Sequence, residues 1–203
     1  MSLLSRWAGG LVGLYGAKMP LVIGPLVAAC GFVLFALPSV GGSYWVTFLP
    51  AVAVLGLGMA VSVAPLTTTV MNSVDAKFAG AASGINNAAS RVSALFAIAL
   101  LGIVLAHVFN KTLEGQLKRV PLSPAVVRAI HAQRDKLAAI ELPDKADPAD
   151  KAAMRRAIDE SFVSGFRWVM IVSALLAAAS AVSAWAMIED GTHGRGGIQP
   201  ARH

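Results

Sequence analysis

The longest apolar stretches of this chain contain almost no charge. Each of the four holds 19 to 29 residues, and they cover 20–38, 44–70, 80–108 and 162–188. Arg91 and Arg167 carry their only formal charges, and neither Asp nor Glu occurs in them. A helix rises about 1.5 Å per residue and needs roughly 20 residues to cross a hydrocarbon core of about 30 Å. The pattern excludes a soluble domain and predicts an all-α integral membrane protein with four complete transmembrane helices.

Charge and cysteine are scarce along the whole chain. Charged residues make up 14% and hydrophobic residues 56%, although the net charge is +6. The basic residues form no single stripe interleaved with aromatics, so we expect no nucleic-acid partner. Cys30 is the one cysteine, which excludes an intramolecular disulfide, and we expect no cysteine-based metal cluster.

Motifs of catalysis are also missing. The sequence holds no G-x-S-x-G, no H-E-x-x-H and no phosphate-binding loop. Because the four spans lack Asp and Glu, the chain offers no carboxylate proton carrier within the membrane. We therefore expect no enzyme, no cofactor and no metal site.

The connections between the spans are uneven in length. We expect 1–19 to be a partial helix followed by a cytoplasmic loop, as if further helices preceded it. Short turns join the first three spans, a helical loop at 109–161 precedes the last one, and a disordered tail fills 189–203. Within the long loop, Asp147-Pro148 is typical of a helix start, as is Ser123-Pro124, so two short helices are expected at 124–140 and 148–160. The second should continue into the last span.

The distribution of basic residues predicts the orientation. Lys18, Lys77, Arg195 and Arg202 fall on the side of the C-terminus, and the turn at 39–43 has no charge. Short basic loops remain in the cytoplasm. We therefore expect a cytoplasmic C-terminus and an external 109–161 loop.

Arg91 is the charge that most needs an explanation. An arginine at the centre of a bilayer costs about 2.5–3.5 kcal/mol on insertion scales. It shares a helix face with Ser83 and Asn87, which precede it at spacings of four. If only 92–108 lies in hydrocarbon, Arg91 can extend its guanidinium to the interface. Otherwise the polar stripe should face protein or a water-filled path, and the sequence leaves both interpretations open.

Small residues and one proline mark expected helix contacts. Pro65 removes a backbone hydrogen bond from the second span and should kink it, while the hydroxyls of the three threonines at 67–69 can bond carbonyls nearby. Small side chains let helices approach closely in lipid. The expected packing positions are Gly56, Gly58, Gly80, Gly84 and Ala88.

Two runs resemble a known family. Pro65-Leu66-Thr67-Thr68 ends a glycine-rich helix, and 80–91 reads GAASGINNAASR. Both resemble the C-terminal portion of the fourteen-span drug:proton antiporters of the major facilitator superfamily (the EmrB/QacA type). The segment 10–18 is similar to a loop of that family, but Gly13 and Leu14 stand where the family has an acid and an arginine.

The resemblance implies a function for the whole transporter. Such proteins move small amphipathic compounds by alternating access, driven by protons, across the bacterial inner membrane. The four spans would be the last four helices of such a bundle, and the missing N-terminal helices, substrate and protons would be partners besides the lipid bilayer. The residues implied to face the substrate path or its gate are Thr67, Thr68, Asn86, Asn87 and Arg91.

A second hypothesis needs no missing helices. The chain could be a self-contained four-span protein that acts through helix–helix association with a partner. The stripes of small residues would then be contact surfaces between subunits. On the first hypothesis the chain alone should not transport.

Overall fold

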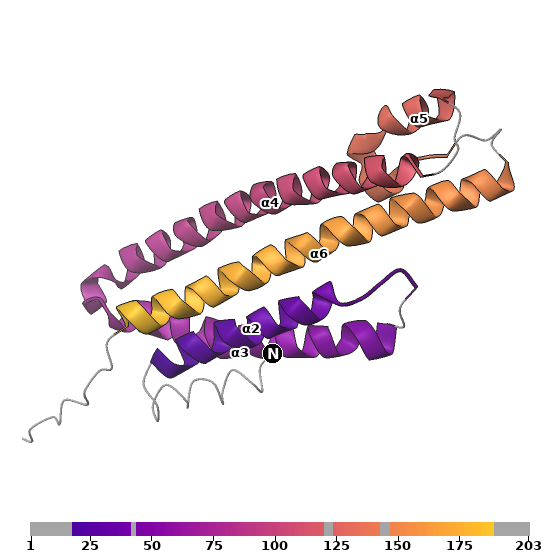
Figure 1. The fold of residues 1–203 in the computed structure, drawn as a ribbon. Helices are drawn as coiled ribbons and strands as arrows, with labels where there is room; N and C mark the ends of the chain where they lie inside the picture. The colour runs from indigo at the N-terminus through magenta and orange to yellow at the C-terminus, as the bar shows by residue number, and fades with distance from the viewer. Residues whose placement is uncertain (1–17, 42–43, 120–123, 143–146, 189–203) are drawn as a thin grey trace, which may run out of the picture.

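The computed structural model describes residues 18–41, 44–119, 124–142 and 147–188, and every regular element in them is helical (Figure 1). The expected helix before residue 18, the expected helix-start residue Ser123 and the tail 189–203 lie outside these ranges. The main helices are α2 (Lys18–Ala36), α3 (Leu49–Asn72), α4 (Ala79–Leu117), α5 (Pro124–His131) and α6 (Pro148–Met187). Shorter turns are a π-helix at Tyr44–Phe48 and 3₁₀ helices at Ala76–Phe78 and Arg134–Ala139. Four of the described helical segments are long and apolar enough to cross a membrane, which confirms the all-α multi-pass class.

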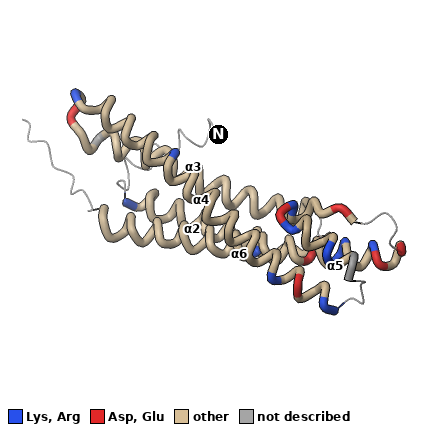
Figure 2. The backbone as a smooth tube through the Cα atoms, turned by 90° about the horizontal axis from the view of Figure 1, so that it is seen from above, with Lys and Arg blue, Asp and Glu red and all other residues tan. Residues whose placement is uncertain are grey.

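The four long helices lie side by side in an order that differs from their order in the chain. α2 packs against α3 on one side and α6 on the other, and α6 packs in turn against α4 (Figure 1). The start of α2, the end of α3, the start of α4 and the end of α6 share one end of the molecule. Most charged residues gather toward the two ends, and the tube between them is largely uncharged (Figure 2).

α4 and α6 extend well beyond the other two helices. With 39 and 40 residues, each is about 60 Å long at helical rise, twice the hydrocarbon thickness. α4 continues past residue 108, the expected end of the third span, to Leu117. Phe109, Leu113 and Leu117 recur every four residues and are buried, so this continuation of α4 has an apolar face of its own.

The extensions of α4 and α6 enclose a small core together with the segment between them. We call this part the cap, made of 109–119, 124–142 and 147–161. Its core is built from apolar side chains of all three segments, namely Phe109, Leu113, Leu117, Ile130, Ile140, Met154 and Ile158. Asp147 starts α6 as the sequence predicts, because its carboxylate accepts a hydrogen bond from the Ala149 N–H at 2.9 Å.

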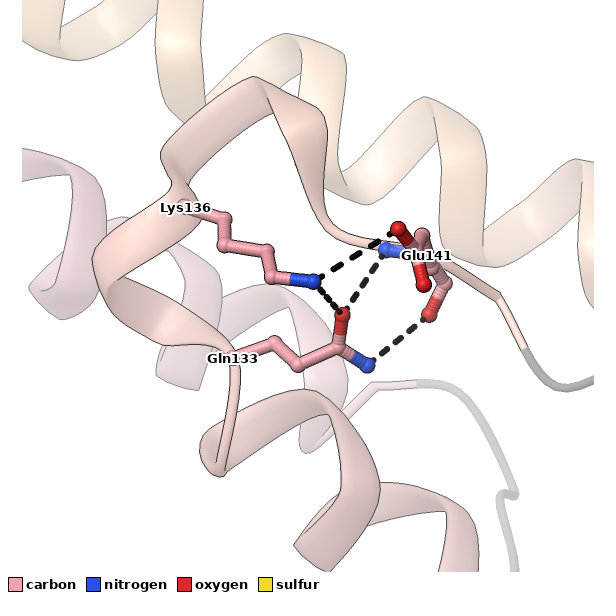
Figure 3. A network of polar contacts seen from close by, with 3 residues as sticks. All are labelled: Gln133, Lys136 and Glu141. Atoms are coloured by element: carbon pink, nitrogen blue, oxygen red, sulfur yellow. Dashed lines mark hydrogen bonds and ion pairs between the residues drawn. The ribbon is translucent and has the colours of Figure 1, made fainter.

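The expected single helix over 124–140 is wrong. α5 ends at His131, and a 3₁₀ turn follows in which Leu137 has a φ of 53°. In one continuous helix, Ile130 and Ile140 would be rotated about 80° apart, whereas the break lets both reach the core. Gln133, Lys136 and Glu141 close the turn (Figure 3), with the Gln133 Oε1 accepting from the Lys136 Nζ at 3.1 Å.

α2 and α3 cross at close range. A Cβ added at Gly58 would overlap the backbone of Ala28, and one at Gly24 would overlap the Ser62 side chain. The Ser62 hydroxyl donates to the Gly58 carbonyl at 2.8 Å, so its polar group is satisfied within α3. Small residues on both helices permit this crossing, as expected for helices that associate in lipid.

Candidate functional site

The second half of α3 carries the first group of candidate residues. Pro65 is fully buried, and α3 continues through it to Asn72. The hydroxyls of Thr67 and Thr68 donate to the carbonyls of Val63 and Ala64 at 3.2 and 3.0 Å. These acceptors lie one turn back on the same helix, and neither is the Val61 carbonyl that Pro65 leaves without its usual donor. Both threonines are exposed, so their outer surface is open to a neighbour.

The first half of α4 carries the second group. Asn87 and Arg91 are exposed, while Ser83 and Asn86 are half-buried. The Ser90 hydroxyl donates to the Asn86 carbonyl at 2.8 Å. Only 6% of the most apolar 18-residue stretch of this segment is buried, against 28% for α2. Asn87 and Arg91 therefore point away from the described part of the chain, whereas Ser83 is partly covered.

The two groups lie on neighbouring arms of a hairpin. Each lies within about three to four helical turns of the connection at 73–78. α3 and α4 have only a small contact, and their main packing partners are α2 and α6. Within the described residues no hydrogen bond joins the groups. Asn87 and Arg91 can donate hydrogen bonds to a ligand or to further helices, whereas the oxygens of Thr67 and Thr68, whose hydrogens are already bonded, can only accept them.

The five expected packing positions have different surroundings. Gly58 lies against the α2 backbone, as described above. A Cβ added at Gly56, Gly80 or Gly84 would meet nothing within 4 Å, and Ala88 is exposed. The described part of the chain therefore leaves the 80–88 stripe without a neighbour.

Sequence reasoning missed three other glycines at helix contacts. Gly24 and Gly31 lie on α2 facing α3, where a Cβ on Gly31 would come within 2.7 Å of the Leu55 nitrogen. Gly165 of α6 lies against Leu105 of α4, where an added Cβ would come within 3.1 Å of its carbonyl oxygen. Gly24, Ala28 and Gly31 are spaced at i, i+4 and i+7, which places them on one helix face. This spacing could have predicted the contacts of Gly24 and Gly31.

Arg167 lies where α6 leaves the cap. Its Nη2 donates to the Pro38 carbonyl at 3.0 Å, so it links α6 to the segment after α2. No group of three His, Cys, Asp or Glu that could hold a metal occurs among the residues that the structure describes.

Comparison with known proteins places the chain beside drug-resistance proteins. No protein-family model matches it. It is 29% identical over 208 residues to Multidrug resistance protein Stp of Mycobacterium tuberculosis, in both strain CDC 1551 and strain H37Rv. That alignment covers 97% of this chain and 37% of the relative. The Quinolone resistance protein NorB of Staphylococcus aureus strain MRSA252 is 31% identical over 112 residues, which is 50% of this chain and 22% of that protein. The chain thus spans little more than a third of the length of the Mycobacterium relative.

Proposed function

We propose that this chain is the C-terminal part of a proton-coupled multidrug efflux transporter of the major facilitator superfamily, of the fourteen-span type. It would act with further helices of the same transporter and would not export compounds alone. The transported compounds are proposed to be small and amphipathic, and transport to proceed by alternating access in a bacterial inner membrane. The two named relatives support drug efflux, and the motifs at 65–68 and 80–91 support the superfamily.

The uncovered face of α4 is the observation that carries the proposal. Ser83, Asn87 and Arg91 lie along one face of a helix that is apolar enough to span a membrane. Exposed to lipid, a polar stripe of this kind is costly, and such residues face the interior of a bundle or a water-filled cavity. Among the described residues nothing buries Asn87 or Arg91, and Ser83 is only half-buried. Further helices of the transporter provide that cover in our proposal.

We propose that the two groups of residues border the substrate path or its gate. Thr67 and Thr68 come from α3, and Asn86, Asn87 and Arg91 come from α4. These groups suit varied amphipathic compounds because the amides both donate and accept hydrogen bonds, while the two threonine oxygens can still accept them. Pro65 would break the regular hydrogen bonding of α3 at the same level.

The proposed orientation places the C-terminus in the cytoplasm. Lys18 at the start of α2 and Lys77 between α3 and α4 lie at one end of the molecule. The turn at 39–43, which joins α2 and α3 at the other end, has no charge. Short basic segments stay inside, so the cap would face the outside of the cell.

Ethidium efflux from bacteria without their own drug pumps tests the proposal. Cells would express either the 203 residues alone or a clone that also carries the preceding DNA. We expect efflux that collapses with a protonophore only from the longer clone. Export by the short chain alone would contradict the proposal.

The same open face supports a second proposal from a different class. A self-contained four-span protein that associates with a partner would also need cover for α4. In favour of it, the cap buries a complete core using residues of this chain alone. The longer clone separates the two, since a partner-binding protein gives no efflux from either clone.

A further inference from the structure

A cavity lies where the cap meets the membrane spans. Its volume is about 430 Å³, and both α6 and the segment after α2 line it. The residues that matter here are Ser39, Arg156, Glu160, Val163, Ser164 and Arg167. None of them belongs to the groups proposed above for the substrate path.

Arg167 lies in the cavity wall, and part of its guanidinium has no hydrogen-bond partner among the described residues. Its Nη2 donates to the Pro38 carbonyl at 3.0 Å. Its Nε is buried and has no hydrogen-bond partner among the described residues. A buried donor without a partner is costly, and a guanidinium bonds most strongly to an anion with two oxygens in a plane, such as a carboxylate or a phosphate.

The charges around the cavity add up to one positive charge. Glu160 is already engaged, because its Oε2 accepts from the Gln116 Nε2 at 3.0 Å and its Oε1 lies 3.7 Å from the Arg156 Nε. Arg156 and Arg167 together exceed this single carboxylate by one charge. The excess matches a monoanion, and the Ser39 and Ser164 hydroxyls can add hydrogen bonds to its oxygens.

Aromatic residues indicate the depth of the cavity relative to the bilayer. Trp168 follows Arg167 and is 52% exposed, and Trp45, just past the turn that holds Ser39, is 73% exposed. Tryptophan concentrates at the level of lipid headgroups. Apolar Val163 lines the cavity beside the charged residues, as a site at this boundary requires.

We propose that this cavity binds the phosphodiester group of an anionic phospholipid, with Arg167 and Arg156 as its cationic ligands. The phosphate oxygens would accept hydrogen bonds from the part of the Arg167 guanidinium that lines the cavity and from the exposed guanidinium of Arg156. The acyl chains would extend along the apolar surface of α6. This site is independent of the transport proposal, since it uses only residues of this chain.

Lipid titration of the purified, delipidated chain tests the site. Native mass spectrometry would measure binding of dioleoyl phosphatidylglycerol, dioleoyl phosphatidylcholine and inorganic phosphate. We expect phosphatidylglycerol to bind about tenfold more tightly than phosphatidylcholine, and Arg156→Gln or Arg167→Gln to weaken it about tenfold, as the loss of one charge-assisted hydrogen bond implies. The Arg156 side chain is 81% exposed, so Arg156→Gln should fold normally. A loss of lipid affinity in this variant then cannot be attributed to misfolding.

Arg155→Gln is the matched control. Arg155 precedes Arg156 on the same helix, but its guanidinium bonds the Ala138 carbonyl and Asp159, both at 3.2 Å, and does not line the cavity. Its removal should leave phosphatidylglycerol affinity unchanged. Equal loss in all three variants, no loss in Arg156→Gln and Arg167→Gln, or equal affinity for phosphatidylcholine would overturn the proposal. Inorganic phosphate that competes as well as the lipid would assign the cavity to free phosphate instead.

Discussion

The close contact between α2 and α3 depends on the absence of a side chain at Gly58. The atoms that a Cβ would meet there belong to the backbone of Ala28 and Gly24, which cannot rotate away as a side chain can. Two residues earlier, Gly56 faces open space. Both glycines lie in the apolar part of α3, so the sequence alone did not distinguish them.

Gly58→Ala should therefore destabilise the chain, and Gly56→Ala should not. We expect a loss of about 1–3 kcal/mol for the first, because the two helices must move apart. The second should leave stability unchanged or slightly higher, since alanine is the better helix former. Unfolding of the detergent-solubilised chain by SDS, followed by circular dichroism, measures both. Equal stability of the two variants would contradict the packing.

Arg91 offers a test of the substrate-path proposal at the same scale. In the complete transporter, Arg91→Lys and Arg91→Ala would be compared by ethidium efflux at matched expression. A guanidinium that takes part in the path or gate is not replaced by an ammonium, because lysine lacks its planar fork. We expect both variants to lose at least about tenfold in efflux rate. Full activity in Arg91→Lys would assign the residue to snorkelling at the interface.

At the scale of helices, the sequence predicted the spans better than their ends. Hydrophobic length alone predicted α2, α3 and the apolar parts of α4 and α6 as helices. It did not reveal that α4 continues to Leu117, since charged Lys111 and Glu114 interrupt the apolar run. The four-residue spacing of Phe109, Leu113 and Leu117 is visible in the sequence. Their burial, however, depends on Met154 and Ile158 of α6, which is far away along the chain.

Ile158→Ala should loosen the cap without disturbing the spans. Ile158 is fully buried in the cap core, and such truncations cost about 2–5 kcal/mol. Trypsin should then cut faster at Arg128 and Arg134, which lie in the segment between α4 and α6. Leu175→Ala, at a position 65% exposed on the same helix, is the control and should leave cleavage unchanged. Unchanged cleavage in Ile158→Ala would mean that the cap does not depend on this core.

At the scale of the molecule, the four long helices lie in the order α3, α2, α6, α4, so α4 packs mainly against α6. The sequence placed the polar stripe of Ser83, Asn87 and Arg91 on one face of α4, and in the structure Asn87 and Arg91 are exposed while Ser83 is half-buried. What covers it could not be read from these residues, because a stripe specifies a need for polar contact and not the identity of its neighbour. The chain spans 37% of the length of the Mycobacterium relative, and on the proposed function further helices of a longer transporter would provide the cover.

Cysteine labelling can locate that cover. A Cys30→Ala background with a new cysteine at Ile85, which is 71% exposed on α4, would be treated with maleimide in detergent. We expect rapid labelling in the chain alone and at least about tenfold slower labelling in the complete transporter, where other helices would shield the site. A cysteine at Trp185, 66% exposed on α6, controls for general accessibility. Equal labelling of the Ile85→Cys variant in both contexts would mean that no further helix covers this face of α4, and would contradict the account.

The most direct test of the central claim is the sequence of the DNA that precedes the Met1 codon. The account predicts that it encodes about ten further hydrophobic segments, each long enough to span a membrane, in the same frame or separated from this one by a frameshift. These would supply the helices that cover α4. An unrelated gene and a stop codon at that position would contradict the account and leave the four-span, partner-binding protein as the better explanation.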